Sequence, residues 1–333
     1  MNSSRLQPGE PGENYIHEII SMKIYRHIEE FTPLGNAVVT SGMFDGVHLG
    51  HRKIIARLLD ICRSCEGESV VLTFWPHPRM VVSDDSSDLR LLSTLSEKAA
   101  LFEALGVQHL LVLPFTRAFS ELSSDEFIRT VLVDGIGTRK LVIGYDHRFG
   151  RNREGSFEFL RAHCGAYGFQ VEEIASEDVD NLAISSSRIR TALLSGGIEE
   201  ANHLLGYEYA LSGTVVKGDQ IGRTLGFPTA NLLVEESYKL IPLDGIYAIR
   251  AEHAGLTYKG MLSIGMRPTV DGKHRTIEAN LFDFDKEIYG EHLTIRFCKY
   301  LRPEEKLKDL EELKRYIEQD KINTLRFFAG QGN

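Results

Sequence analysis

The stretch VVTSGMFDGVHLGHRKII, residues 38–55, decides how the chain begins to fold. An apolar run ends in glycines and a Phe-Asp pair, and His48 and His51 stand where an amphipathic segment begins. This change of pattern predicts a strand that is followed at once by a helix. The first turn of a helix offers unpaired N–H groups, and two imidazoles beside it would add donors for an anion. On these residues alone, a metal site, acid–base catalysis and ordinary surface histidines stay open.

The same alternation continues through the first two thirds of the chain. Short β-branched runs stand at 37–40, 70–75, 110–113, 141–144 and 170–174. Helical patterns lie between these runs, and the clearest one places on a single face Ile54, Ile55, Leu58, Leu59 and Cys62. Another begins with Ser123 and Glu126 in the spacing of a capping box. Strands that alternate with helices predict an α/β fold with a parallel sheet, whose ligands bind beyond the carboxyl ends of the strands.

After about Leu205 the pattern changes. Glycine-rich turns, rather than helices, separate strands predicted at 211–217, 245–251, 258–264, 277–284 and 292–300. This pattern is typical of a small antiparallel β-barrel. A carboxy-terminal helix is predicted from about residue 301, with Pro303 in its first turn and a packing stripe formed by Leu307, Leu310, Leu313 and Ile317. We therefore expect a loose tail at 1–21, an α/β domain at 22–205 and a barrel domain at 206–333.

Composition narrows the class of partner. The 333 residues carry a formal net charge of −9, which argues against broad binding of nucleic acid or of anionic membranes. No apolar run approaches the ~20 residues that span a bilayer, and the first 21 residues lack the apolar stretch of a secretory signal. The cysteines are expected to be thiols in a reducing cytoplasm, although Cys62 and Cys65 form a C-x-x-C. We expect a cytoplasmic protein with small-molecule partners, and the sequence does not indicate its oligomeric state.

Glycines beside the two histidines favour a phosphate ligand. Gly42, Gly46 and Gly50 permit tight turns and a close approach of the backbone to a ligand. A cradle of this kind suits a triphosphate, whose charge must be spread when a P–O bond breaks. A zinc site built on Asp45 and the histidines is a weaker interpretation, because nothing nearby completes the ligand set.

Two later segments strengthen the phosphate interpretation. VIGYDHRFGRNREG, residues 142–155, follows the fourth strand and carries Asp146, His147, Arg148, Arg151 and Arg153. ISSSRIRTALLSGG, residues 184–197, places serines at a helix start before Arg188 and Arg190. Serine caps together with arginines make a second anion site. Taken alone, each segment could equally be a capped helix with a charged face in solvent.

These motifs resemble a known family. GMFDGVHLGH with ISSSRIR is similar to the signature of nucleotidyltransferases related to class I aminoacyl-tRNA synthetases, which implies a Rossmann-like domain. LTFWPHPR and GYDHRFG narrow the resemblance to the adenylyltransferase module of bacterial bifunctional riboflavin kinase/FAD synthetases. The resemblance implies that Asp146 serves the flavin phosphate or magnesium, and that His48, His51 and Arg190 are catalytic. It implies ATP-binding roles for Gly42, Phe44, Asp45, Gly46, His48, Gly50, His51, Ser186, Ser187 and Arg190.

The second domain carries its own constellation in LSGTVVKGDQIGRTLGFPTANL, residues 211–232. Its glycines permit a flexible flap, and Thr229 and Asn231, two residues apart on an extended segment, face the same side. Hydroxyl and amide oxygens suit magnesium, which takes few protein ligands. A glycine-rich hairpin with a Pro-Thr turn explains the same residues. Further on, Glu278 alternates with Ile277 and Ala279, which makes it either a solvent-facing residue or a base for an alcohol substrate.

A resemblance to the riboflavin kinase module favours the catalytic interpretation. GRTLGFPTANL, DGIYA, SIGMRPTV and EANLFDFDKEIYGEHL are similar to that module and stand in its expected order. The similarity implies Glu278 as general base, Thr229 and Asn231 as magnesium ligands, and Arg296 near the flavin. It implies ATP-binding roles for Gly218, Gly222, Gly226, Thr229 and Asn231.

The resemblance runs from Met22 to the end of the chain, with small departures. Ser187 stands where threonine is commoner, Asn280 where histidine is often seen, and Trp75 where the family is often acidic. The implied activity is phosphorylation of riboflavin to FMN followed by adenylylation of FMN to FAD, with ATP as the second substrate and Mg²⁺ as cofactor. The alternatives are a nucleotidyltransferase for another phosphorylated metabolite and a flavin-binding sensor without catalysis.

Overall fold

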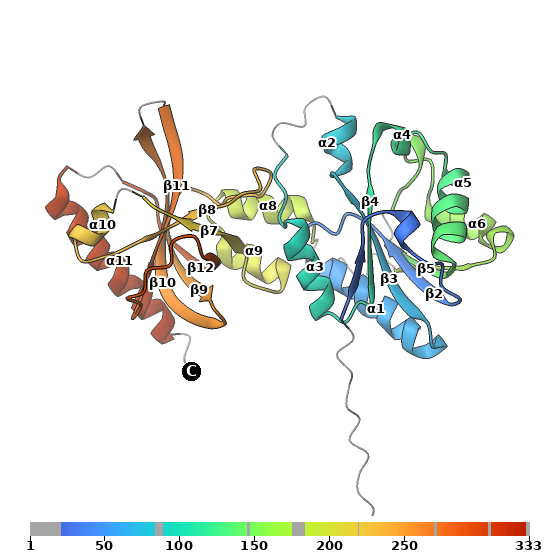
Figure 1. Ribbon diagram of the computed structural model, residues 1–333, viewed down its shortest axis with the longest axis horizontal. Helices are drawn as coiled ribbons and strands as arrows, with labels where there is room; N and C mark the ends of the chain where they lie inside the picture. The colour runs from blue at the N-terminus through green and yellow to red at the C-terminus, as the bar shows by residue number, and fades with distance from the viewer. Residues whose placement is uncertain are drawn as a thin grey trace, which may run out of the picture.

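The computed structural model describes residues 21–83, 89–144, 147–174, 184–218, 220–269, 272–305 and 308–330. Nearly all of the predicted tail, and the candidate site residue Asp146, lie outside these ranges. The described chain forms an α/β lobe and a barrel lobe, with α8 (Ser186–Leu194) and α9 (Ile198–Leu205) between them (Figure 1). Within the described residues, no helix has the length and apolar character needed to cross a membrane.

The α/β lobe is built on a parallel sheet in the order β1-β4-β3-β2-β5-β6. Its strands are β1 (Lys23–Tyr25), β2 (Ala37–Ser41), β3 (Glu68–Trp75), β4 (His109–Pro114), β5 (Thr138–Gly144) and β6 (Gln170–Ile174). The five predicted strands are confirmed, whereas the short edge strand β1 was not predicted. The chain runs outward from β2 to β3 and β4 on one side, then to β5 and β6 on the other. Such a switch point opens a crevice at the carboxyl ends of β2 and β5.

Helices cover both faces of this sheet (Figure 1). On one face lie α1 (Leu49–Cys65) and α3 (Leu95–Ala104), and on the other lie the π-helix η2 (Ile128–Ile136) and α6 (Phe157–Tyr167). The remaining helices of the lobe are η1 (Ile28–Glu30), α2 (Pro78–Val82), α4 (Arg117–Ser120), α5 (Ser124–Phe127) and η3 (Arg151–Arg153). The predicted face of α1 is confirmed, with Ile55, Leu58 and Cys62 buried, and the capping box of Ser123 and Glu126 opens α5 as predicted.

The second lobe is a closed antiparallel barrel in the order β10-β11-β8-β7-β12-β9. Its strands are β7 (Ala210–Val216), β8 (Ala230–Leu233), β9 (Gly245–His253), β10 (Leu256–Thr269), β11 (Gly272–Leu281) and β12 (His292–Arg302), with the short helix α10 (Ile221–Thr224) before β8. The predicted barrel is confirmed. The unpredicted strand is β8, which follows Pro228 and Thr229 and pairs with both β7 and β11.

The carboxy-terminal helix is confirmed, but its predicted start is wrong and its predicted packing stripe holds only in part. Helix α11 runs from Leu310 to Gly330, because residues up to Arg302 continue β12 and pair with β9. Of the predicted stripe, Leu310 is 57% exposed, Leu313 and Ile317 are partly buried, and Leu307 lies outside the described residues. The fully buried side chains of the helix are those of Asp320, Thr324 and Phe328. Asp320 is buried because both of its oxygens accept from the Arg302 guanidinium, at 2.8 and 2.7 Å.

The two helices between the lobes share a hydrophobic core with the barrel. The buried faces of α8 and α9, including Ile189, Leu193 and Leu204, belong to one cluster with barrel residues such as Tyr247 and Phe297. The predicted boundary at 205/206 therefore falls at the end of a helix that packs with the barrel. The division of the chain into domains stays a prediction, and the packing places α8 and α9 against both modules.

Candidate active sites

The end of β2 and the start of α1 hold the two histidines against each other. His48 is the N-cap of α1, and its Nδ1 atom accepts a hydrogen bond from the backbone N–H of His51 at 3.4 Å. The two rings are stacked, with their centroids 3.5 Å apart. Because Nδ1 of His48 is an acceptor, its proton resides on Nε2, which is free to donate. Nδ1 of His51 is buried and has no partner among the described residues.

Burial keeps both imidazoles neutral. It lowers the pKa of His48 to about 4, and the nearby Asp45 carboxylate only partly opposes this shift. Burial also holds the pKa of His51 well below its ordinary value, assisted by His48 and Lys98. Neutral rings at physiological pH are hydrogen-bond donors rather than cations. This state agrees with phosphate binding through N–H groups and disagrees with a proton shuttle working near pH 7.

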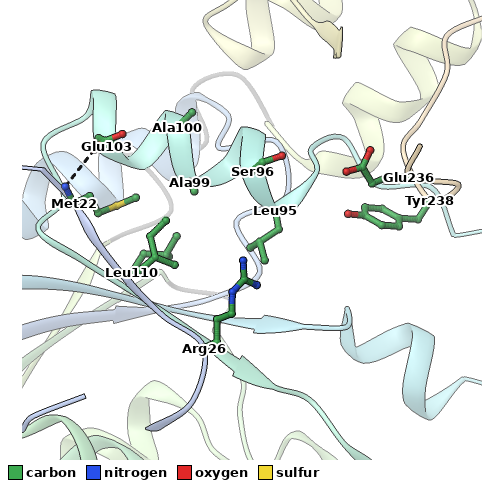
Figure 2. A pocket seen from close by; sticks show the side chains of 11 residues that line it. Met22, Arg26, Leu95, Ser96, Ala99, Ala100, Glu103, Leu110, Glu236 and Tyr238 are labelled. Carbon is green, nitrogen blue, oxygen red and sulfur yellow. Dashed lines mark hydrogen bonds between the residues drawn. The ribbon is translucent and has the colours of Figure 1, made fainter. Parts of the chain in front are cut away.

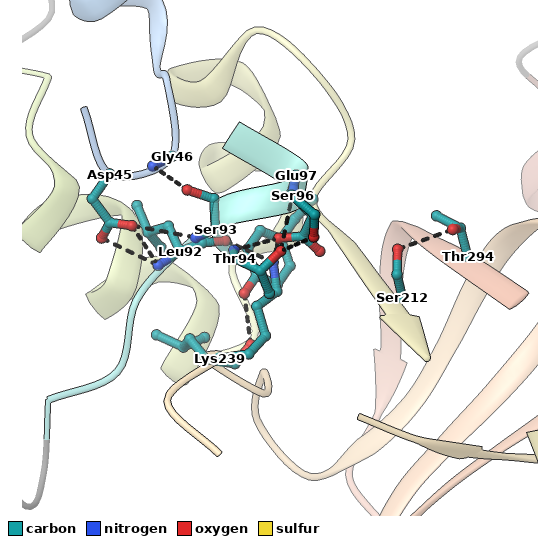
Figure 3. Close-up of polar contacts among 12 residues, drawn as sticks. Asp45, Gly46, Leu92, Ser93, Thr94, Ser96, Glu97, Ser212, Lys239 and Thr294 are labelled. Carbon is teal, nitrogen blue, oxygen red and sulfur yellow. Dashed lines mark hydrogen bonds and ion pairs between the residues drawn. The ribbon is translucent and has the colours of Figure 1, made fainter. Parts of the chain in front are cut away.

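Asp45 is fully engaged within the protein. Its carboxylate accepts from the backbone N–H of Leu92 at 2.9 Å and of Ser93 at 3.2 Å (Figure 3). It also forms a partly buried ion pair with Arg190. The Arg190 Nε atom also donates to the carbonyl oxygen of Arg90 at 2.7 Å. Asp45 therefore orients Arg190 and is not a free metal ligand in this structure.

The structure places α8 beside the loop after β2, as the phosphate interpretation requires. The Ser186 hydroxyl donates to the Asp45 carbonyl oxygen at 3.0 Å, while Ser187 is exposed on the first turn of α8. Arg190 lies on the same helix, 145 residues from its Asp45 partner in sequence. Arg188 turns away and pairs with Glu200 of α9 at 2.7 Å. The segment thus contributes Ser186 and Arg190 to the cradle.

The remaining candidates of the GMFDG loop support its shape. Phe44 is 4% exposed and packs edge-on against His51 and Phe102, so its ring belongs to the core. Gly42 faces the Phe44 ring, where a Cβ would come within 3.1 Å. Gly46 has a φ of +80°, and its N–H donates to the Ser93 hydroxyl at 3.1 Å. Gly50 is buried in the first turn of α1.

Sequence reasoning missed two groups that join this cluster. Lys98 of α3 is 5% exposed and donates to the Met43 carbonyl oxygen at 2.7 Å. Burial lowers its pKa to about 8, although Asp45 partly opposes the shift. His77 lies in the WPHP turn after β3, and burial lowers its pKa to about 4. The charges of Lys98 and Arg190 lower this pKa as well, whereas Asp45 partly opposes the shift. One feature of the sequence could have indicated that Lys98 is buried: its helical spacing places it on the same face as the apolar residues Leu95 and Phe102.

The other cationic segment packs elsewhere in the lobe. The Arg151 N–H donates to the Leu122 carbonyl oxygen at 2.7 Å, and Gly150 lies against Ser124. Arg148 is 3.9 Å from Glu158 of α6, and His147 stacks on Phe149. These contacts attach residues 147–155 to α5 and α6. Asp146, which was predicted to serve the flavin phosphate or magnesium, directly precedes these residues and lies outside the described residues.

In the barrel, the register of the strands gathers the candidate kinase residues. Glu278 of β11 is paired with Asn231 of β8, and the Thr229 hydroxyl lies 3.5 Å from a Glu278 carboxylate oxygen. The Thr276 hydroxyl donates to the other carboxylate oxygen at 3.2 Å. Glu278 keeps 26% of its side-chain surface exposed. The three oxygen-bearing side chains Thr229, Asn231 and Glu278 therefore meet at one place on the barrel.

The three candidate glycines near Glu278 have different structural roles. Gly218 lies against the Asn231 side chain, so a Cβ at Gly218 would displace it. Gly222 belongs to α10, where its carbonyl oxygen accepts from the Phe227 N–H at 2.8 Å, and Gly226 has a φ of +85°. Arg296 is held by Glu252 in a bidentate ion pair at 2.5 and 3.1 Å.

Asn280 was missed as a supporting residue. It lies two residues after Glu278 on β11 and is 7% exposed. Its side-chain amide donates to the Pro228 carbonyl oxygen at 2.7 Å. The loop before β8 covers the outer face at this point, and the hydrogen bond fixes the residue that precedes Thr229.

A separate cavity of about 510 Å³ lies between β1, α3 and the approach to the barrel. Met22, Leu95, Ala99 and Leu110 give it an apolar lining, and Glu236 and Tyr238 close one end (Figure 2). Its lining includes none of the candidate site residues.

Comparison with known proteins defines the class. A family model described as FAD synthetase matches residues 31–188, in the α/β lobe, and a model described as riboflavin kinase matches residues 205–328, in the barrel lobe. A chain with these two modules in this order is a flavin-nucleotide-forming transferase of two parts.

Whole-chain relatives give the particular family. The chain is 39% identical to the bifunctional riboflavin kinase/FMN adenylyltransferase of Listeria monocytogenes, over 95% of this chain and 98% of that protein. It is 36% identical to the protein of the same name from Escherichia coli, over 92% and 98% of the two chains. The chain belongs to the family of bifunctional riboflavin kinase/FMN adenylyltransferases.

A solved structure shares the arrangement of both lobes. A Streptococcus pneumoniae protein whose structure is titled a macrolide-efflux protein superimposes with a TM-score of 0.83 at 29% sequence identity. The match covers 92% of this chain and 99% of that one. The placement of the barrel beside the α/β lobe is therefore common to both structures.

Proposed function

We propose that the barrel, residues 206–333, phosphorylates riboflavin with ATP to give FMN, and that the α/β module, residues 22–205, adenylylates FMN with a second ATP to give FAD and pyrophosphate. The chain is a bifunctional riboflavin kinase and FMN adenylyltransferase by family. The observation that carries the division of labour is that each family model matches one lobe, and that each lobe holds its own polar cluster.

Adenylyl transfer needs charge stabilisation more than it needs a base. A phosphate oxygen of FMN attacks the α-phosphorus of ATP, and the bond to the bridging oxygen of the β-phosphate breaks to release pyrophosphate. The attacking phosphate is already ionised at neutral pH. The neutral rings of His48 and His51 donate N–H bonds to the phosphates, and Arg190, oriented by Asp45, supplies positive charge. Lys98 adds a second buried cation. Positioned donors of this kind carry the rate of phosphoryl-type transfers.

Phosphorylation of riboflavin needs a base, because its 5′-hydroxyl is a poor nucleophile until its proton is removed. Glu278 accepts that proton as the hydroxyl oxygen attacks the γ-phosphorus, and ADP leaves. The Thr276 hydroxyl orients one oxygen of the Glu278 carboxylate. Arg267, 3.7 Å from Glu278 and 2.7 Å from Glu304, adds positive charge beside it.

The donor set beside Glu278 fits magnesium. Thr229 offers a hydroxyl oxygen and Asn231 an amide oxygen, and both lie next to the carboxylate of Glu278. Oxygen ligands few in number, shared with phosphates and water, are what Mg²⁺ takes in kinases. Thr229 and Asn231 would hold the ion, which when bound neutralises charge on the transferred phosphate.

The four cysteines are free thiols, which supports a reducing, cytoplasmic location.

A product assay tests the proposal. Pure full-length protein is incubated with riboflavin, ATP and Mg²⁺, and the flavins are separated over time. We expect FMN to appear first and FAD to follow. Absence of FMN would remove the kinase assignment, and FMN without FAD would remove the transferase assignment. Binding of flavin with neither product would identify a sensor. Replacement of FMN by other phosphorylated metabolites tests whether the transferase serves a different substrate.

A further inference from the structure

We propose that Lys239, a residue of the barrel module, is a positioning residue for adenylyl transfer in the other module. It acts through residues 90–93, called here the linking segment, which carry the partners of Asp45, Gly46 and Arg190. The inference rests on the proposed function of the α/β module.

On the barrel side, the linking segment is held by main-chain and side-chain bonds. Lys239 is 3% exposed, and its Nζ atom donates to the Leu92 carbonyl oxygen at 2.7 Å and to Glu97 at 2.6 Å (Figure 3). Leu91 and Lys239 form a parallel β-bridge, with the Leu91 N–H donating to the Tyr238 carbonyl oxygen at 2.7 Å. The Leu240 N–H donates back to the Leu91 carbonyl oxygen at 2.9 Å.

On the cradle side, the same short segment meets the proposed ATP-binding residues. The N–H groups of Leu92 and Ser93 bind the Asp45 carboxylate, and the Ser93 hydroxyl accepts from the Gly46 N–H at 3.1 Å. The Arg90 carbonyl oxygen accepts from Arg190. The Leu92 carbonyl oxygen thus accepts a hydrogen bond from Lys239, and the Leu92 N–H donates one to the Asp45 carboxylate. One residue of the main chain joins the barrel to the carboxylate that orients Arg190.

The chemistry of Lys239 argues for a positioning role rather than simple stabilisation. Burying a lysine is costly, and burial lowers its pKa while Glu97 partly opposes the shift. A buried ion pair contributes little net stability compared with apolar residues of similar size, and its best-attested use is to fix a register. Lys239 also lies over the Tyr209 ring at 4.5 Å. These bonds set where the linking segment stands, and therefore where Asp45 and Arg190 stand.

The consequence is a selective defect. Without the Lys239 side chain the linking segment keeps the two backbone bonds of Leu91 to the barrel but loses the bond to the Leu92 carbonyl oxygen. Leu92, whose N–H binds Asp45, is then held less firmly, and the placement of Asp45 and Arg190 loosens with it. Small misplacements of groups that align reacting atoms lower rates strongly, so FMN adenylylation should lose about tenfold or more in kcat/KM for ATP. Riboflavin phosphorylation should stay unchanged, because the cluster around Glu278 does not include the linking segment.

The test uses full-length Lys239→Met, the double variant Lys239→Met with Glu97→Gln, and Lys299→Met as the matched control. Gln at position 97 removes the charge and can still accept from the Thr94 N–H in the capping box of α3. Lys299 is also a barrel lysine that pairs with a glutamate across the junction, Glu199 of α9 at 3.3 Å, but it does not contact the linking segment. For each protein, kcat and KM of both reactions and the thermal midpoint are measured. The double variant removes the Glu97 charge that the single variant leaves without its cation.

We expect the double variant to regain the thermal midpoint but not the rate of FMN adenylylation, and both activities of Lys299→Met to match the parent. Recovery of adenylylation together with stability would overturn the proposal, as would an equal fall in both activities of the Lys239 variants. A parent protein that makes no FAD from FMN would instead refute the proposed function. The two failures are therefore distinguishable.

Discussion

The two candidate sites are organised in opposite ways. In the α/β module the polar groups are buried and largely satisfied by one another: Asp45 binds Arg190 and two backbone N–H groups, and His48 binds His51. In the barrel, Glu278 stays partly exposed, and its contact with Thr229 is long at 3.5 Å. The first arrangement suits a reaction between ionised phosphates, which needs fixed donors. The second suits a reaction that must take up a proton and share its charge with a metal ion.

Removal of the base should have the largest effect. Glu278→Gln keeps the shape of the side chain but cannot accept a proton, so kcat for FMN formation should fall roughly 10²–10⁴-fold. Conversion of FMN to FAD by the same preparation should be unaffected. Glu291→Gln, which alters a barrel carboxylate paired with His253, is the control. FMN formation within a few-fold of the parent would show that Glu278 is not the base.

Loss of the paired histidines should produce the reverse pattern with a somewhat smaller effect. His48→Ala combined with His51→Ala removes two phosphate donors, so kcat/KM for FMN adenylylation should fall roughly 10²–10³-fold. Riboflavin phosphorylation reports that the chain is still folded, and its rate should hold. His163→Ala, on the exposed side of α6, is the matched control. If the double variant lost both activities equally, the separation of the two sites would be wrong.

Lys98 should give the smallest change, and it should depend on pH. Its pKa of about 8 means that its charge is lost above that pH, so kcat/KM of adenylylation for ATP should fall at higher pH while the kinase does not follow. In Lys98→Met this alkaline decline should disappear, because no charge remains to lose. In Lys98→Arg the charge persists, and the decline should also disappear while the rate near pH 7 is kept.

The conformational stability of the protein should rise with pH over the range in which the rate of adenylylation falls. Because the folded-state pKa of Lys98 is lowered, the unfolded chain binds more protons between pH 8 and the ordinary lysine pKa. The free energy of unfolding of the parent should therefore rise relative to Lys98→Met across that window, by on the order of 3 kcal/mol at full deprotonation. Urea denaturation at pH 7.5 and pH 10.5 measures this difference. An alkaline decline that survives in Lys98→Met would assign it to another group.

Local sequence pattern predicted the strands well where a strand is long and apolar. The runs at 70–75 and 141–144 became β3 and β5, because buried central strands of a parallel sheet must be apolar on both faces. Strand β1 has only three residues and lies at an edge, and β8 begins directly after Pro228 and Thr229. Neither segment has an apolar pattern that predicts a strand. Each becomes a strand through its partners, β1 by pairing with β4 and β8 by pairing with β7 and β11.

Polar residues that are buried by a distant partner could not be predicted. The buried face of α11 continues from Leu313 and Ile317 to Asp320, which pairs with Arg302, and apolar periodicity does not reveal such a buried ion pair. The ATP-binding role expected of Asp45 stays a prediction; the sequence did not indicate that its carboxylate binds Arg190 and the linking segment. The histidine pair itself was visible in the sequence, because its helix start and its spacing are local features. The catalytic roles of these residues stay predictions until the variants above are measured.

The shared core of α8, α9 and the barrel has a consequence for the supply of cofactors in a cell. Buried residues of α9 such as Leu204 pack in one cluster with Leu92 of the α/β lobe and with the barrel residue Leu211, so unfolding of the barrel exposes apolar surface of α9 and of Leu92. A protease or chaperone that captures a partly unfolded molecule would withdraw the capacity to make FMN and the capacity to make FAD together. The ratio of the two capacities is thereby set by one polypeptide and is insulated from differences in turnover.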